Sequence, residues 1–446
     1  MRASRELLME PVKIIGGGLA GAEAAWQMLR RGIPVRLFEM RPAVSTEVHR
    51  TDRLAELVCS NSLGSMASDS AAGLLKEELR RLDSLIMKAA LRFPVPAGKA
   101  LAVDGGKFSQ FITDTLTQNP LFTLERQEVR DIPEGYCILA SGPLTSPALA
   151  ESLQRMTGED HLFFYDAVAP VVELDSVDMT VAYRKDRYED GGDYINCPMD
   201  KESYLRFYDA LVSAQRAPLR DFEKDAKYFE GCMPVEVLAS RGLDTLRFGP
   251  LRPVGLEDPR SGARPYAAVQ LRQDNLEGTL YNMVGFQTNL RWSEQERVFR
   301  LIPGLERAEF VRMGVMHRNI YVDAPRCLDG FLRLAGQEKL FLAGQLAGVE
   351  GYLESTAMGA VAALGVFSSL MGLPQPQWPQ ESAIGALLRR LRDTAAPRPA
   401  PVNATMGIFP PLEEKIKNRR DRNLRLIQRG REKMDAFAGE YPQFFS

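Results

Sequence analysis

The chain has 446 residues, of which 45% are hydrophobic and 26% charged, and this composition excludes a mainly disordered protein. At about 150 residues per domain, the length predicts two or three domains. The 56 basic and 58 acidic side chains leave a net charge of −2. This balance excludes a surface that is positive throughout but leaves room for a local basic patch.

Neither a signal peptide nor a membrane span is expected. Acidic residues interrupt the N-terminal segment, residues 1–15, where a signal peptide would have an unbroken apolar run. The most apolar stretch, residues 359–373, is rich in Gly, Ala and Ser and is too short to cross a bilayer comfortably. We therefore expect a cytoplasmic protein that is not associated with a membrane.

Cysteine and histidine usage argues against a metal site and against disulfides. The five cysteines are widely spaced without a CxxC pair, and three histidines are too few for a His-built site. We expect no bound metal, and reduced thiols as in a reducing compartment. The cysteines are Cys59, Cys137, Cys197, Cys232 and Cys327.

The N-terminal region has the pattern of a dinucleotide-binding unit. An apolar strand over 12–15 leads into a glycine-rich turn over 16–21 and a helix over 22–31. A second strand over 35–39 follows and ends in Glu39. This complete context indicates a dinucleotide site rather than a glycine-rich turn that binds nothing.

The residues of this turn have separate expected roles. Gly16 permits the tight turn, Gly18 lets the backbone approach a pyrophosphate, and Gly21 lets the helix pack closely on the strand. The pyrophosphate would lie at the positive end of the helix, and Glu39 would hydrogen-bond a ribose hydroxyl. The predicted site consists of Gly16, Gly17, Gly18, Leu19, Ala20, Gly21 and Glu39.

The middle of the chain changes in character. A helix is predicted over 71–92, and a buried strand over 136–140 is expected to join the first parallel sheet. From about 165 to 330, short β-rich runs alternate with Pro and Gly turns, which predicts an inserted domain with an antiparallel sheet. The clearest runs are 168–174, 267–271 and 280–286.

The α/β pattern returns after the inserted domain. A strand over 339–343 leads into a second glycine-rich turn over 344–351 and a helix over 354–370. A flavoprotein of the two-part FAD type needs such a late element near the flavin, so Gly344 and Gly351 are the expected contacts. Because no second GxGxxG unit with a following acid is present, a separate NAD(P) domain is not expected.

The C-terminal region is basic. After a partly Pro-rich stretch over 374–402 with a short helix over 384–392, residues 415–433 carry nine Lys or Arg and two acids, a local charge of +7. Such asymmetry indicates either contact with a polyanion or a solvated helical face.

Four further residues are candidates for chemistry. Cys59 is followed by small polar residues, which indicates a loop or a helix start where N–H groups favour a thiolate. Cys232, with Gly before it and Pro two residues after it, lies in a special turn. Either thiol could instead be structural. His317 and Tyr352 could line a pocket or could simply pack.

Several segments, taken in order, resemble one family. They include IIGGGLAGAEAAWQMLRRGIPVRLFEMRP, HRTDRLAELVCSNSLGS, FEGCMPVEVLASRG, GVMHRNIYVDAP and LAGQLAGVEGYLESTAMG. On these motifs the chain resembles the bacterial folate- and FAD-dependent tRNA (uracil-5-)-methyltransferases from residue 12 to about 370. Longer flavoproteins that modify the wobble uridine of tRNA share the FAD fold, but CSNSLG and GCMPVE look like the methyltransferases.

The resemblance implies an α/β protein with a Rossmann-like FAD-binding domain of the two-part FAD type. An inserted α+β domain and a basic C-terminal helical tail complete it. The expected boundaries are 1–165 and 331–373 for the two parts of the FAD-binding domain, 166–330 for the inserted substrate domain, and 374–446 for the linker and tail.

The resemblance also implies methylation of C5 of the T-loop uridine of tRNA, position 54 in tRNA numbering, to give 5-methyluridine. A thiolate that adds to uracil C6 makes C5 nucleophilic, and C5 then takes a one-carbon unit from methylenetetrahydrofolate. Two more electrons are needed to make a methyl group. FAD reduced by NAD(P)H can supply them as hydride.

The resemblance also implies roles for the residues that match the family's motifs. Cys232 resembles the nucleophile toward C6, and Cys59 the second active-site cysteine, which assists deprotonation at C5. His317 resembles the residue that stacks on the folate pterin, and Tyr352 an aromatic of the same site near the flavin. The expected RNA contacts in the tail are Lys415, Lys417, Arg419 and Arg420.

The sequence is also compatible with three alternatives. The same chemistry could act on ribosomal RNA, because the catalytic residues would be identical. A flavin-binding RNA chaperone would need no reactive cysteine. A small-molecule flavin oxidoreductase would leave the basic tail without a role. The oligomeric state is not predicted.

Overall fold

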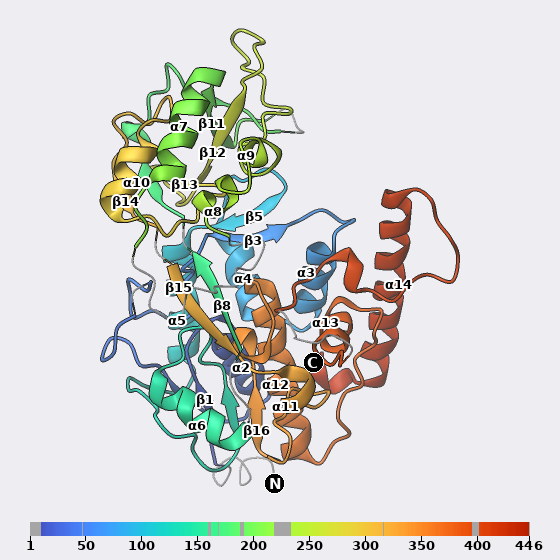
Figure 1. The fold of residues 1–446 in the computed structure, drawn as a ribbon. Helices are drawn as coiled ribbons and strands as arrows, with labels where there is room; N and C mark the ends of the chain where they lie inside the picture. The colour runs from blue at the N-terminus through green and yellow to red at the C-terminus, as the bar shows by residue number, and fades with distance from the viewer. Residues whose placement is uncertain are drawn as a thin grey trace.

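The computed structural model describes residues 10–46, 48–158, 169–187, 191–217, 233–314, 316–394 and 401–445, and gives the backbone alone for 162–167 and 316–318. The buried side chains form two large hydrophobic cores. One core combines the N-terminal and C-terminal parts of the chain, and the other spans Val172 to Ala308. Figure 1 shows the second core as an upper lobe in green and yellow, with a C-terminal helix along one side.

The first core surrounds a parallel sheet with the strand order β16-β7-β1-β2-β6. Its strands are β1 (Val12–Ile15), β2 (Val35–Phe38), β6 (Phe122–Glu125), β7 (Cys137–Leu139) and β16 (Leu340–Leu342). The central strand β1 is almost entirely apolar because a parallel strand is covered on both faces. Strand β16 pairs with β7, so both α/β segments build one sheet, as predicted for a two-part FAD-binding domain.

Two helices, α2 (Leu19–Leu29) and α12 (Tyr352–Met371), pack closely against each other beside this sheet. A Cβ atom on Gly359 of α12 would collide with the backbone of Ala20 of α2, so glycine permits this approach. By length and composition, α12 is the one described helix that could cross a membrane, but 83% of its apolar window is buried inside the protein. Its apolar sequence therefore suits a core helix.

The single helix predicted over 71–92 is two helices, α3 (Ala71–Arg81) and α4 (Leu85–Arg92). Asp83 lies between them with a φ of 59°, a left-handed conformation that no helix continues through. The Ser84 hydroxyl then caps the first turn of α4. Apolar spacing does not reveal the break, because buried leucines continue across it.

The upper lobe contains the predicted antiparallel sheet, with the order β10-β11-β12-β13-β9-β14. Its strands are β9 (Val171–Glu173), β10 (Tyr183–Arg184), β11 (Tyr194–Met199), β12 (Ala267–Gln273), β13 (Leu280–Met283) and β14 (Phe310–Arg312). Its described helices are α7 (Lys201–Ser213), α8 (Val235–Ala239), α9 (Thr245–Phe248) and α10 (Trp292–Phe299).

Two smaller sheets lie between the cores. The antiparallel strands β8 (Leu162–Ala167) and β15 (Met316–Tyr321) carry the chain to and from the upper lobe. A second sheet, β3-β5-β4, lies directly beneath that lobe in Figure 1. Its strands are β3 (Ser62–Ser65), β4 (Pro94–Val95) and β5 (Ala100–Val103), and the remaining helices of this part are α5 (Gly105–Thr117), α6 (Pro147–Thr157) and α11 (Ala324–Cys327).

The C-terminal region packs against the first core through α13 (Ala383–Leu391) and α14 (Arg419–Glu440). The buried carboxylate of Glu78 on α3 accepts the backbone N–H of Ala383 at 2.7 Å and of Ile384 at 2.9 Å. Because these are N-terminal N–H groups of α13, Glu78 caps that helix from another element. The predicted short helix over 384–392 is thereby attached to α3.

Candidate active site

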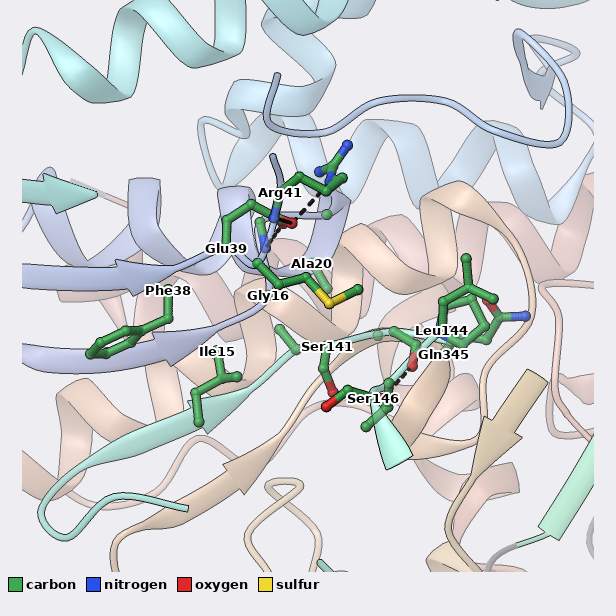
Figure 2. Close-up of a pocket in the computed structure, with 18 of the residues that line it drawn as sticks. Ile15, Gly16, Ala20, Phe38, Glu39, Arg41, Ser141, Leu144, Ser146 and Gln345 are labelled. Atoms are coloured by element: carbon green, nitrogen blue, oxygen red, sulfur yellow. Dashed lines mark hydrogen bonds and ion pairs between the residues drawn. The ribbon is translucent and has the colours of Figure 1, made fainter. Parts of the chain in front are cut away.

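A cavity lies beside the carboxyl ends of the parallel strands (Figure 2). The glycine-rich turn and the start of α2, residues 16–20, line part of it together with Glu39 after β2. Gln345, Tyr352 and Ser355 from the second α/β segment line another part. The fold therefore brings both predicted glycine-rich segments to one cavity.

The glycines of the first turn have different steric roles. Gly16 has a φ of 103°, and a Cβ there would collide with the backbone of Ala140 after β7. A Cβ on Gly21 would collide with the carbonyl oxygen of Gly16, so this glycine lets α2 begin against the turn. A Cβ on Gly18 would meet no protein atom within 4 Å, which leaves space for a phosphate at the cavity wall.

The start of α2 suits an anionic ligand. Its N-cap residue is Gly18, which has no side chain to accept the N-terminal N–H groups. Leu19 and Ala20 follow at the cavity wall, where the positive end of the helix dipole favours a pyrophosphate. The donor groups and the open space together fit the ADP half of FAD.

Glu39 is held in place by its neighbours. Its Oε2 accepts the Gly17 N–H at 2.9 Å, and its Oε1 accepts Nε–H of Arg41 at 2.9 Å. Burial acts to raise the pKa of Glu39, but the hydrogen bonds from Arg41 and Gly17 outweigh it and keep that pKa below its ordinary value. Arg41 also contacts Glu56 at 3.0 Å. Glu39 is therefore an ionised acceptor at the cavity wall, as a ribose ligand requires.

The second glycine-rich segment shapes another part of the wall. Gly344 has a φ of 68°, and a Cβ there would lie 2.8 Å from the Cβ of Ala20. Gly344 lines the cavity, whereas Gly351, with a φ of 116°, is the N-cap residue of α12. The predicted flavin-side residues thus differ in position: one lies at the wall and the other sets the start of the helix.

Tyr352 connects this cavity to Cys59. The Tyr352 hydroxyl oxygen accepts the backbone N–H of Cys59 at 2.8 Å and of Ser60 at 3.2 Å. Burial raises the pKa of Tyr352 well above its ordinary value, so the hydroxyl is protonated at neutral pH. Cys59 lies in a half-buried bend before β3 and is not in a disulfide, so of the two predicted possibilities the loop is correct.

Asn61 joins the bend that carries Cys59 to the upper lobe. Its Nδ2 donates to the carbonyl oxygens of Val103 at 3.0 Å and Gln273 at 2.9 Å. Its Oδ1 accepts Nε–H of Arg272 at 3.2 Å. Because Arg272 and Gln273 are the last residues of β12, one buried amide orients the bend relative to both neighbouring sheets.

Two predicted residues are described only in part or not at all. Cys232 lies outside the described residues. His317 belongs to β15, where its backbone pairs with Asp166 of β8, and its side chain is outside the description. The structure therefore places the strand of His317 between the two lobes.

The other cysteines differ from Cys59 in their surroundings. Cys137 and Cys197 are fully buried, and burial raises the pKa of each thiol to about 12. Cys327 is also buried. Burial in apolar surroundings makes a thiol inert, so these three suit packing rather than catalysis.

The basic residues of the tail lie around the start of α14 and do not line the cavity. Lys415, Lys417, Arg419 and Arg420 are all exposed. Arg420 lies 3.8 Å from Asp69, whereas the other three side chains form no ion pair within the described chain. Figure 1 places α14 on the flank of the molecule, where a large ligand could reach it.

Comparisons with known proteins agree with this architecture. The family model described as "Glucose inhibited division protein A" matches residues 11–374. The chain is 55% identical to a methylenetetrahydrofolate–tRNA-(uracil-5-)-methyltransferase TrmFO of Heliobacterium modesticaldum, over 96% of this chain and 98% of that one. The chain belongs to the TrmFO family. The TrmFO of Desulfitobacterium hafniense is 54% identical over the same shares.

A solved structure shares the fold of this TrmFO-family chain. GidA of Aquifex aeolicus superposes with a TM-score of 0.66, covering 98% of this chain and 77% of that chain, at 16% identity. At this identity the likeness shows the fold alone. It confirms the Rossmann-like FAD-binding architecture predicted from the glycine-rich turn.

Two residues of the site, Arg41 and Asn61, were not predicted from the sequence. Each follows a predicted site residue by two positions, Arg41 after Glu39 and Asn61 after Cys59, so the motifs contained both. Arg41 binds Glu39 and Glu56, which are 2 and 15 residues away, whereas Asn61 binds Gln273, which is 212 residues away. No local pattern indicates such a partner.

Proposed function

We propose that this chain is a folate- and FAD-dependent methyltransferase that converts a uridine of tRNA to 5-methyluridine. The observation that carries the proposal is the connection between the dinucleotide cavity and Cys59 through the Tyr352 hydroxyl. Tyr352 lines the cavity and its hydroxyl accepts the backbone N–H of Cys59, which supports a role for this cysteine next to the bound flavin. The relatives, which are more than half identical over nearly the full chain, are named for the same activity.

In this proposal each cysteine has its own role in the reaction. Cys232 adds to uracil C6, and Cys59 assists removal of the proton from C5. C5 takes its one-carbon unit from methylenetetrahydrofolate. Bound FAD, reduced by NAD(P)H, supplies the two electrons that turn this unit into a methyl group. Residues 16–21, with Glu39, hold the ADP moiety.

The remaining assignments are part of the same proposal. His317 and Tyr352 belong to the folate site, and Gly344 and Gly351 lie on the flavin side. Lys415, Lys417, Arg419 and Arg420 bind RNA phosphates, which is supported by their exposure. The two cores support a division into an FAD-binding domain, residues 1–165 and 331–373, and an inserted substrate domain, 166–330. Residues 374–446 form the linker and tail.

The target we propose is the T-arm of tRNA, at uridine 54, and the proposed location is the cytoplasm. The relatives are named for tRNA, which favours tRNA over ribosomal RNA. The decisive assay uses the purified flavin-containing protein with NADPH and methylenetetrahydrofolate labelled in its one-carbon unit. Unmodified tRNA and ribosomal RNA are supplied in separate tubes. Label in tRNA alone, at position 54, is expected; label in neither RNA rejects the proposal.

A cysteine variant tests the role of the nucleophile. Cys232→Ala should abolish methylation and keep the flavin absorption, because the thiol acts in chemistry and not in cofactor binding. Cys137→Ala is the control, since that buried thiol lies in strand β7 and should have no chemical role. Methylation by Cys232→Ala at the wild-type rate contradicts the assignment.

A further inference from the structure

Arg312 is the last residue of β14, at the point where the upper lobe leads back to the first core. Its backbone pairs with Val171 of β9, and β15 begins four residues later. Within the described residues, its Nε and Nη2 atoms are buried and have no hydrogen-bond partner. A guanidinium is always charged, so two buried donors without an acceptor are costly.

Nε and Nη2 form the edge of the guanidinium that donates two parallel hydrogen bonds to a planar acceptor. At Arg431 the same edge binds Glu77, with Nε and Nη2 at 2.7 and 2.6 Å from its carboxylate oxygens. At Arg260 it binds Asp258 in the same way. The corresponding edge of Arg272 donates from Nε to Asn61. Arg312 therefore presents a two-donor fork whose acceptor is not part of the described chain.

The sheet register relates Arg312 to the bend that carries Cys59. Arg312 lies in one row across the sheet with Val171, Asn282 and Arg272, and Arg272 donates to Asn61 of that bend.

The charge of Arg312 acts on the hydroxyl of Tyr352 and on the carboxyl of Asp274. Burial raises the pKa of both groups, and Arg312 opposes that rise in each. Tyr352 is the residue that accepts the N–H of Cys59, so the fork, the thiol and the flavin end of the cavity belong to one region.

We propose that Arg312 donates Nε–H and Nη2–H to a ring carbonyl of the molecule that reacts beside Cys59. This inference rests on the proposed function. A carbonyl next to a ring N–H, the lactam group, occurs both in the pterin of the folate and in uracil. A planar fork matches such a carbonyl better than a lysine ammonium, which is a point charge.

The two sources give Arg312 different tasks. If the acceptor is the pterin carbonyl, the fork positions the folate, and loss of the fork weakens folate binding. With uracil, the fork acts in the transition state. As the thiolate forms its S–C6 bond, the C5–C6 π pair is displaced and the negative charge develops on O4, where two N–H donors stabilise it. No further reactant is needed for that step.

The test compares Arg312→Lys, which keeps the charge and removes the fork, with Arg431→Lys. The control loses the same fork on a half-buried contact to Glu77. Both flavin-containing proteins are measured for tetrahydrofolate affinity, tRNA affinity, melting temperature, and kcat and KM of methylation. We expect Arg312→Lys to keep its flavin and its tRNA affinity. Either its tetrahydrofolate affinity or its kcat of methylation should fall by about 10- to 100-fold.

Whether tetrahydrofolate affinity or kcat falls shows which ring carbonyl, that of the pterin or that of uracil, accepts from Arg312. A weaker tetrahydrofolate affinity assigns the fork to the pterin. An unchanged affinity with a lower kcat assigns it to uracil. If Arg312→Lys matches Arg431→Lys in every measurement, or lowers only the melting temperature, the fork serves packing with Asp274 and the inference is wrong. The wild-type assay judges the proposed function separately, and tetrahydrofolate binding can be measured even without turnover.

Discussion

At the scale of single residues, the site is arranged through backbone groups as much as through side-chain chemistry. The Tyr352 hydroxyl accepts two N–H groups at the bend that carries Cys59, and Asn61 holds the other side of that bend. Removing an acceptor from buried donors costs about 1–3 kcal/mol per group. Small changes at these residues should therefore move the thiol without unfolding the protein.

Tyr352→Phe tests this arrangement. The variant keeps the aromatic ring at the cavity wall, so flavin content should remain close to wild type. Methylation should fall by about 10-fold or more, because the N–H groups of Cys59 and Ser60 lose their acceptor. Tyr194→Phe is the control, since it removes a hydroxyl that donates to Ala97 and not to the bend. Equal activities of the two variants would contradict the role.

Gly18 and Gly21 make a contrasting pair for the cofactor site. Gly18→Val points a side chain into space where no protein atom lies within 4 Å, so the protein should fold without flavin. Gly21→Val collides with the Gly16 carbonyl oxygen, so it should lower the melting temperature as well. Absorption spectra and thermal unfolding separate the two outcomes. A yellow Gly18→Val protein would count against the phosphate position.

At the scale of elements, the packing of α2 against α12 brings the start of each helix to the cavity. The small side chains along α12 let the helices approach, so the sequence pattern serves both packing and cofactor binding. The starts of both helices meet at the cavity wall: Gly18 and Ala20 belong to one, and Tyr352 and Ser355 to the other.

Gly359→Ala tests that approach. Its Cβ would collide with the backbone of Ala20, so overpacking should cost about 1–3 kcal/mol and reduce flavin content. Gly439→Ala in α14 adds the same methyl group where no atom lies within 4 Å. It should leave the stability and the flavin content unchanged. Thermal unfolding and flavin content are measured for both variants. Equal melting temperatures would mean that α2 and α12 can separate at little cost.

At the scale of the whole molecule, buried polar groups attach the outlying parts to the first core. Asn61 connects the upper lobe, and Glu78 connects the C-terminal region through α13. Burial raises the pKa of Glu78 from 4.5 to about 7, although the N–H groups of Ile384 and Ala383 oppose the rise. The folded protein therefore favours the protonated carboxyl.

This shift predicts a pH dependence of stability. Because the pKa is higher in the folded state, the contribution of Glu78 is complete below about pH 4.5 and is lost as the pH rises through about 7. In Glu78→Gln this titration is absent. The free energy of unfolding of wild type relative to the variant should fall between pH 5 and 8 by at most about 3 kcal/mol. Urea unfolding at several pH values measures this difference; parallel curves would reject it.

Much of the fold could be predicted because its signals are local. The strand, glycine turn and acid of the first unit lie within residues 12–39, and a Cβ at Gly16 or Gly21 would collide with nearby backbone, in keeping with the tight turn that the motif predicts. The antiparallel inserted sheet followed from short β-rich runs with turns. The break at Asp83 could not be predicted, because the left-handed conformation of one residue leaves the apolar spacing unchanged.

The sequence by itself determined the family, the two-part FAD-binding architecture and the residues to examine, because motifs and periodicity depend on neighbours along the chain. Only the tertiary structure decided what holds those residues. Cys59 is attached to Tyr352 across 293 residues, and Asn61 to Gln273 across 212. The buried fork of Arg312 also depends on folding, because a guanidinium loses its water only when distant strands and helices pack around it.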